Sequence, residues 1–335
     1  MGWVDLDRRL MLSLTVLSVA LTIALTFSTL EVIRVTNDLL YPSFPDAGLL
    51  VPVSGTARML GYACLIGVVL LILLGVLTAR KCLAPAGAVA FFIPAFGDFA
   101  ASMFLLAGLG VLRVLWLPLK ELDPVIFRLG DVALLPYWAV LETEQRLIGS
   151  WPHVDPWRLR IWVPHLVIAA GWLVLFLGIL TWLHGKLEKE RVYSYGIYKY
   201  TRHPQYVGFI LWSYGILLFT LAEGGFWGAP TLYPSFPWAI STLTIICVAL
   251  AEERTMVTLA DSEYRAYQEH TPFMIPLPRV VSRVITAPHR LLLRKAYPET
   301  LPEILCVFVI YTLIIGTLSY AVYISQILCS QFLFL

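Results

Sequence analysis

The sequence predicts an all-α membrane protein, a polytopic bundle of about seven transmembrane helices with additional interfacial or re-entrant helices. Of the 335 residues, 59% are hydrophobic and only 14% are charged, whereas soluble domains carry roughly 25% charged residues. Long apolar runs alternate with short polar segments, as expected of helices that cross a bilayer. The net charge of +2 is too small to indicate binding to nucleic acid.

Residues 1–160 form the first predicted region, which contains three transmembrane segments. These segments are Leu10–Ile33, Leu60–Thr78 and Pro85–Leu106. At 1.5 Å per residue the first gives about 36 Å of helix, which is enough to cross a bilayer. Asp98 lies inside the third segment, where an acid is either functional or caps a kink after Pro94 and Gly97.

The segment Gly108–Ser150 contains apolar pieces that are too short to cross a bilayer. The pieces Val111–Leu117 and Val132–Leu141 are separated by charged residues that include Lys120, Asp123 and Asp131. We therefore predict interfacial or re-entrant helices here, with a tight pair of extra transmembrane helices as the alternative.

Four further transmembrane segments are predicted in the second half of the chain. They are Ile161–Leu183, Pro204–Ala222, Trp238–Ala251 and Leu301–Leu328. Residues 161–295 would form a catalytic core, and residues 296–335 a C-terminal transmembrane helix. With seven spans, most basic residues fall on one side, including five between Arg279 and Lys295. The positive-inside rule then places the N-terminus and both polar stretches described next in the cytoplasm, and the C-terminus outside.

The first polar stretch, Gly196–Gly208, reads GIYKYTRHPQYVG and lies between two apolar segments. Pro204 is predicted at the first position of a helix, because its missing N–H would be unpaired there anyway. His203 would then be the N-cap, and the free amides of the first turn together with Arg202 would bind a carboxylate or phosphate. The alternative is a charged turn that contacts lipid headgroups.

The second polar stretch, Glu252–Pro276, follows the next apolar segment. We interpret Glu252 and Glu253 as the end of an apolar helix, and since adjacent residues differ by about 100°, only one can face a ligand squarely. Tyr264 and Tyr267 share a helical face and could stack on an aromatic or cationic ligand, or be ordinary interfacial tyrosines. We predict that the two polar stretches meet on one side of the membrane and form one active site.

A family resemblance rests on these two stretches. The pattern G-x-Y-x-x-x-R-H-P-x-Y-x-G is matched by Gly196, Tyr198, Arg202, His203, Pro204, Tyr206 and Gly208, and is followed by Glu252, Glu253, Tyr264, Tyr267, Pro272 and Pro276. The region from Tyr193 to Pro276, a quarter of the chain, resembles the integral-membrane methyltransferases of the isoprenylcysteine carboxyl methyltransferase and phospholipid N-methyltransferase superfamily.

The resemblance implies S-adenosylmethionine-dependent methyl transfer to a lipid or lipidated acceptor that arrives from the bilayer, in contact with membrane lipids. It implies cofactor binding by Tyr193, Gly196, Tyr198, Arg202, His203, Pro204, Tyr206, Gly208, Glu252, Tyr264 and Tyr267. A carboxylate or thiolate acceptor needs no strong base, whereas an amine must lose a proton, which Glu252, Glu253 or His270 could accept. We predict no metal site, because the five cysteines show no zinc-binding spacing.

Two other functions are compatible with the sequence. Membrane NADPH-dependent sterol-type reductases carry a similar Arg-His-Pro-x-Tyr-x-Gly motif, but they typically place an acid after the glycine, where this chain has Phe209. A non-enzymatic transporter or scaffold would require polar residues at mid-membrane in broken helices, and Asp98 is the candidate for such a residue.

Overall fold

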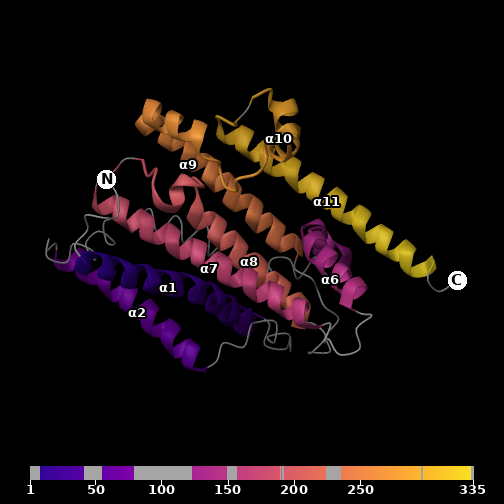
Figure 1. Cartoon of the computed structure of the whole chain (residues 1–335), viewed down its shortest axis with the longest axis horizontal. Helices are drawn as coiled ribbons and strands as arrows, with labels where there is room; N and C mark the ends of the chain where they lie inside the picture. Colours follow the sequence, from indigo (N-terminus) through magenta and orange to yellow (C-terminus); the bar gives the residue numbers. More distant parts are fainter. Residues whose placement is uncertain are drawn as a thin grey trace.

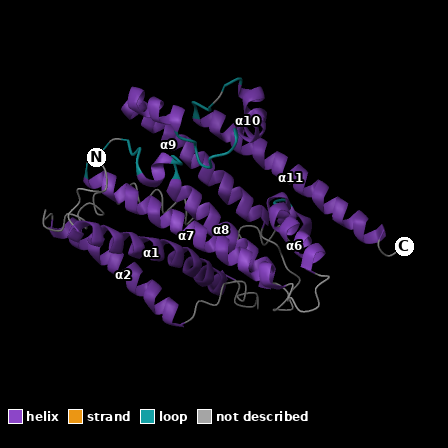
Figure 2. Ribbon diagram, in the orientation of Figure 1, coloured by secondary structure: helices purple, strands orange, loops and turns teal. Residues whose placement is uncertain are grey.

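The structure is a computed structural model, and it describes residues 8–40, 55–78, 123–148, 157–188, 190, 192–223, 235–295 and 297–332. Every regular element in these residues is helical (Figure 2). The α-helices are α1 (Arg8–Leu40), α2 (Gly55–Thr78), α6 (Leu135–Ile148), α7 (Trp157–Leu187), α8 (Pro204–Glu223), α9 (Ser235–His270), α10 (Arg279–Leu293) and α11 (Leu301–Phe332). Short 3₁₀ helices are η5 (Pro124–Arg128), η6 (Asp131–Leu134) and η7 (Gly196–Lys199).

The long helices lie side by side, with α7 and α8 as the central pair (Figure 1). Helices α1 and α2 cover one side of this pair, while α9 and then α11 lie on the other. The described loops gather mainly at one end, where η7 joins α7 to α8 and an extended segment joins α9 to α10 (Figure 2). This end carries both polar stretches.

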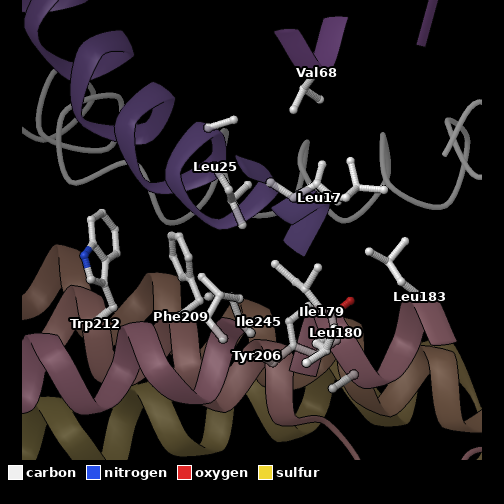
Figure 3. Packing of buried hydrophobic residues seen from close by; sticks show 14 of the residues in the cluster. Leu17, Leu25, Val68, Ile179, Leu180, Leu183, Tyr206, Phe209, Trp212 and Ile245 are labelled. Atoms are coloured by element: carbon white, nitrogen blue, oxygen red, sulfur yellow. The ribbon is translucent and has the colours of Figure 1, made fainter. Parts of the chain in front are cut away.

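The main hydrophobic core joins α1 and α2 to the central helices (Figure 3). Leu17 and Leu25 of α1 face Ile179 and Leu183 of α7, and Phe209 of α8 is fully buried beside them. Burying a side chain of this size contributes about 1.5–3 kcal/mol relative to exposure in water. The same core contains Tyr206, Trp212 and Ile245, so the framework that holds α7, α8 and α9 together extends to the polar end.

Glycines line the contact between α7 and α8. A Cβ added at Gly208 would lie 2.3 Å from the backbone nitrogen of Leu175, and one at Gly171 would lie 2.2 Å from that of Trp212. At the other end of this contact, Gly215 faces the backbone of Ile168 in the same way. The pairing is antiparallel, and small residues let the two backbones approach more closely than side chains would allow.

Within the residues that the structure describes, four helices are long and apolar enough to cross a membrane: Leu10–Glu31, Leu159–Leu187, Ser235–Leu259 and Leu301–Gln326. Shorter apolar helices, Arg58–Leu70 and Pro204–Phe219, coincide with two more predicted segments. The predicted segment Pro85–Leu106, with Asp98, lies outside the described residues, as does Val111–Leu117. The α-helical class is confirmed for the residues described, and the count of about seven spans stays a prediction.

The interpretation that Glu252 and Glu253 end an apolar helix is wrong. Helix α9 is a single 36-residue helix that continues past both glutamates to His270. No proline or glycine occurs between Trp238 and Thr271, so the chain has no strong helix breaker where the hydrophobic stretch ends. The second polar stretch is therefore mostly a continuation of an apolar helix.

The piece Val132–Leu141 belongs to η6 and to α6, a helix of 14 residues that measures only about 21 Å. It is therefore too short to cross a bilayer. Asp131 is fully buried, accepts a hydrogen bond from Ser235 at 2.7 Å and pairs with Arg128 at 2.9 Å. Burial raises the pKa of this carboxyl group. These contacts attach η5 and η6 to the start of α9, at the end opposite the polar stretches.

Candidate functional site

A cavity of about 350 Å³ opens where α7, η7, α8 and α9 meet. It is lined by Ile179, Trp182, Lys186, Val192, Tyr193, Tyr198, Arg202, His203, Gln205, Tyr206, Glu252, Thr255, Met256, Tyr264 and Tyr267. Its volume is within the range of small-molecule and cofactor sites, about 300–1,000 Å³. Residues of both polar stretches contribute, so the structure brings the two stretches together.

The first polar stretch turns sharply before it enters α8. Gly196 has a φ of +57°, a left-handed conformation that favours glycine, and a Cβ there would lie 2.9 Å from the Thr181 hydroxyl of α7. The 3₁₀ helix η7 follows, and α8 begins at Pro204. The predicted helix start at Pro204 is thus confirmed. This turn buries Arg202 and His203 instead of exposing them to solvent.

Glu253 is the centre of a buried polar cluster. Its carboxylate lies 2.9 Å from Nη1 of Arg202, with side chains 5% and 1% exposed respectively, and 3.2 Å from Nε2 of His203. Gln268 and Tyr264 donate to the same carboxylate at 3.0 and 3.4 Å. A buried carboxylate with this many donors is satisfied, so Glu253 fixes the position of Arg202 and His203.

Glu252, one residue earlier on α9, has a different environment. Its side chain is 50% exposed and lines the cavity. The hydroxyl of Tyr206 donates to it at 2.5 Å, and Nδ1 of His203 is 3.8 Å away. His203 therefore lies between the two carboxylates. The rotation of about 100° between adjacent helical residues places Glu253 in the protein interior and Glu252 at the cavity.

Tyrosines from both stretches line the cavity. The rings of Tyr264 and Tyr267 are 5.9 Å apart, and those of Tyr193 and Tyr198 are 5.6 Å apart. Tyr267 donates a hydrogen bond of 2.6 Å to the backbone carbonyl of Tyr198, which ties the second stretch to the first. The pKa values of all four phenols are raised, mainly because the side chains are buried.

The segment Thr271–Pro278, which joins α9 to α10, covers Arg202 and His203. The carbonyl of Pro272 accepts a hydrogen bond of 3.1 Å from the backbone N–H of Arg202. The ring of Phe273 lies 5.6 Å from the Arg202 guanidinium and 5.2 Å from the His203 ring. Tyr297, beyond α10, approaches the same guanidinium at 5.9 Å.

The raised phenol pKa values predict loss of stability at alkaline pH. In the unfolded chain these tyrosines ionise near pH 10, whereas in the folded protein they remain neutral to higher pH. Their contribution to the free energy of unfolding is therefore complete below pH 10 and is lost as pH rises through the folded pKa values. We therefore expect the midpoint temperature of thermal unfolding in detergent to decrease as the pH is raised above 10. Tyr264→Phe and Tyr267→Phe together should reduce this fall, and an identical pH dependence in that variant would contradict the assignment.

The predicted site residues divide into two groups. The cavity is lined by Tyr193, Tyr198, Arg202, His203, Tyr206, Glu252, Tyr264 and Tyr267. The residues Gly196, Pro204, Gly208, Glu253 and His270 do not line it. Gly196 and Gly208 act through the backbone, by the turn before η7 and by the close approach to α7, and Pro204 starts α8. His270 is exposed at the end of α9.

Several cavity residues were missed by sequence reasoning. On α7, Ile179, Trp182 and Lys186 line one side of the cavity, and on α9 Thr255 and Met256 lie beside Glu252. Their spacing of three or four residues, typical of one helical face, is a signal that could have identified them. It was obscured on α7 because the whole helix is apolar.

The fold and the site define a helical protein with apolar helices of membrane-spanning length and a tyrosine-rich, charged cavity at one end. Comparisons with known proteins concern the region of that cavity. A family of proteins of unknown function, DUF1295, matches residues 181–271. A relative named methanethiol S-methyltransferase 1, from Bradyrhizobium diazoefficiens, is 32% identical over 87 residues, which are 25% of this chain and 26% of the relative.

The chain thus aligns with about a quarter of the length of the curated relative that it matches. No solved structure matches the chain. The family match and the relative's name suggest a membrane methyltransferase-like protein. The more specific superfamily indicated by the sequence motifs stays a prediction.

Proposed function

We propose that this protein is a multi-pass membrane enzyme that transfers a methyl group from S-adenosylmethionine to an apolar acceptor, with its site on the cytoplasmic side. The observation that carries this proposal is the cavity at the junction of the two polar stretches. The region matched by the family, residues 181–271, includes all but one of its lining residues. The relative that aligns with a quarter of the chain is a methyltransferase by name.

The residues of the cavity fit the chemical groups of S-adenosylmethionine. Among the described residues, Nε of Arg202 is buried without a hydrogen-bond partner, and a ligand carboxylate could accept a hydrogen bond from it. Glu252 offers a half-exposed carboxylate to a cationic group. Tyr264 and Tyr267 offer aromatic faces for an adenine ring. When bound, the cofactor would supply a methyl group on a positively charged sulfur.

The acceptor would approach from the α7 side of the cavity. Ile179 and Trp182 line this side and belong to an apolar helix of membrane-spanning length. An acceptor that partitions into the bilayer, such as a lipid, a lipidated molecule or a small apolar thiol, could reach the cavity without first entering bulk water. The surrounding tyrosines would exclude water and align the acceptor. Such alignment can lower the activation barrier by up to about 7–11 kcal/mol.

Among the three predicted proton acceptors, we favour Glu252. It lines the cavity and is half-exposed, whereas Glu253 is occupied by donors on several sides and His270 does not line the cavity. An amine acceptor would lose its proton to Glu252, which accepts a hydrogen bond from Tyr206. A thiolate or carboxylate acceptor would require only alignment.

Calorimetry on the purified full chain tests this proposal. We expect S-adenosylhomocysteine to bind the unaltered protein and its binding to be lost in His203→Ala, because this change removes the ring between Glu252 and Glu253. His270→Ala is the matched control and should bind like the unaltered protein. Binding of NADPH in place of S-adenosylhomocysteine would favour a reductase, and binding of neither would contradict the proposed function.

A further inference from the structure

Helix α10 has two distinct exposed faces. Its apolar face carries Val280, Val284 and Leu291, which are 71%, 68% and 79% exposed. At 100° per residue these three side chains project within about 40° of one another. Val281, Ile285 and Leu292, which are 42%, 47% and 65% exposed, widen the same face. A contiguous exposed apolar face of this kind typically marks a site of contact with a membrane or another protein.

The basic face lies beside the apolar face. Arg279, Arg283 and Arg290 are exposed and project within about 40° of one another on the wheel. Arg294 and Lys295 follow at the C-terminal end, and no acidic residue occurs between Arg279 and Lys295. Arginine side chains at the border of an apolar face can extend toward phosphates while their stems remain on apolar surface.

The third side of α10 is attached to the bundle. The Tyr311 hydroxyl of α11 donates to the backbone carbonyl of Ile285 and lies 3.0 Å from Nδ1 of His289, which is buried. Helix α11 is itself apolar and long enough to cross a membrane. These contacts hold α10 next to a candidate membrane span, at the end of the bundle that carries the cavity (Figure 1).

We propose that α10 is an interfacial helix that inserts its apolar face into the bilayer surface and binds anionic lipid headgroups through its arginines. An apolar face beside a basic face is typical of helices that lie in the membrane interface. Anionic headgroups attract basic segments, and the lack of acidic residues between Arg279 and Lys295 makes α10 complementary to them. The occupant is therefore a negatively charged lipid surface.

This placement has a consequence for the cavity. Both segments that flank α10 contact Arg202. Pro272 and Phe273 come from the segment before the helix, and Tyr297 comes from the segment after it. A helix held in the membrane surface would fix both segments, and with them the cover over Arg202 and His203. Anionic lipid would thus order the cavity as well as bind the helix.

Spin labels on the full chain test the location of α10. In a variant whose five native cysteines are replaced by alanine, a nitroxide is attached at Val284→Cys or, as the matched control, at Arg283→Cys. The protein is reconstituted into vesicles of phosphatidylcholine with phosphatidylglycerol. We expect the Val284 label to collide more with oxygen than with a water-soluble nickel chelate, at a depth of about 5–10 Å. The Arg283 label should show the reverse preference.

Two results would overturn the proposal. A Val284 label that collides freely with the nickel chelate would place the apolar face in water. A label shielded from both reagents, with shielding that increases with protein density in the vesicle, would place this face against a second copy of the chain.

The role of negative charge is tested separately. Replacing Arg279, Arg283 and Arg290 together by glutamine should reduce the depth of the Val284 label in phosphatidylglycerol vesicles to the value found in phosphatidylcholine alone. The apolar face is intact in this variant, and circular dichroism checks that the helix is retained. A depth that depends on neither the arginines nor the anionic lipid would overturn the headgroup assignment.

Discussion

Replacing Glu253 by alanine is expected to lower the free energy of unfolding by about 3–5 kcal/mol and to abolish the proposed binding of S-adenosylhomocysteine. The change leaves the guanidinium of Arg202, whose side chain is 1% exposed, without the carboxylate 2.9 Å away. Removing one partner of a buried pair is expensive because the remaining charge is still buried. His203 would lose its contact at 3.2 Å as well, so the cavity would be disordered.

The adjacent residue provides the control. Glu252→Gln changes a side chain that is half-exposed and lines the cavity, so we expect a change in stability below about 1 kcal/mol together with loss of methyl transfer to an amine acceptor. Thermal unfolding in detergent and S-adenosylhomocysteine binding would be measured for both variants. Equal destabilisation by the two changes would contradict the different roles assigned to these neighbouring glutamates.

A double replacement separates stability from binding. Arg202→Met with Glu253→Leu removes both charges, and apolar replacement of a complete buried ion pair is often neutral for stability. We expect this variant to be more stable than Glu253→Ala and still unable to bind S-adenosylhomocysteine. If it bound the ligand normally, the buried pair would have no role in the site.

Replacing Gly208 by alanine is expected to lower the free energy of unfolding by about 1–3 kcal/mol. The added methyl group would lie 2.3 Å from the backbone nitrogen of Leu175, and a backbone atom cannot move aside as a flexible side chain can. Helices α7 and α8 must therefore separate. Because α8 begins at Pro204, directly after His203, this separation should also weaken S-adenosylhomocysteine binding.

Gly316→Ala is the matched control for Gly208→Ala. Gly316 lies inside α11, and no heavy atom comes within 4 Å of the Cβ that the change would add. Alanine favours the helix over glycine by about 1 kcal/mol, so this variant should be as stable as the unaltered protein or slightly more stable. Thermal unfolding of both variants provides the measurement, and similar destabilisation would indicate a general intolerance of the helices to substitution.

The sequence predicted the helical class of the described residues, because the length of an apolar run is a local property. It also predicted that the two polar stretches meet, because their motif chemistry is local as well. The end of α9 could not be located from hydropathy, because hydropathy changes at Glu252 while helix propensity does not. The same continuity gives Glu252 and Glu253 their different environments. Which of the two glutamates faces the cavity depends on how α9 packs, and the sequence alone does not determine this.

The residues of α7 that line the cavity were the part of the site that the sequence predicted least well. Trp182 occurs in a helix that is apolar on all sides, so no periodicity distinguishes the cavity face from the lipid or core faces. In the sequence Lys186 is one of several basic residues that follow the apolar segment Ile161–Leu183, and nothing there distinguishes it as a cavity residue. Their contribution became evident once Tyr193 and Tyr198 were seen to fold back against α7.

Because α9 is unbroken, its length sets the position of the site residues that it carries. From Ser235, which is held by Asp131 and by the carbonyl of Phe127, the helix rises about 26 Å to Glu252. The depth and direction of both carboxylates are therefore set by the number of residues between these points. One residue more or less would shift them by about 1.5 Å and turn them by about 100°. An insertion would turn Glu252 into the interior position that Glu253 now holds, and a deletion would turn Glu253 toward the cavity. The length of this helix is as much a part of the site as its side chains are.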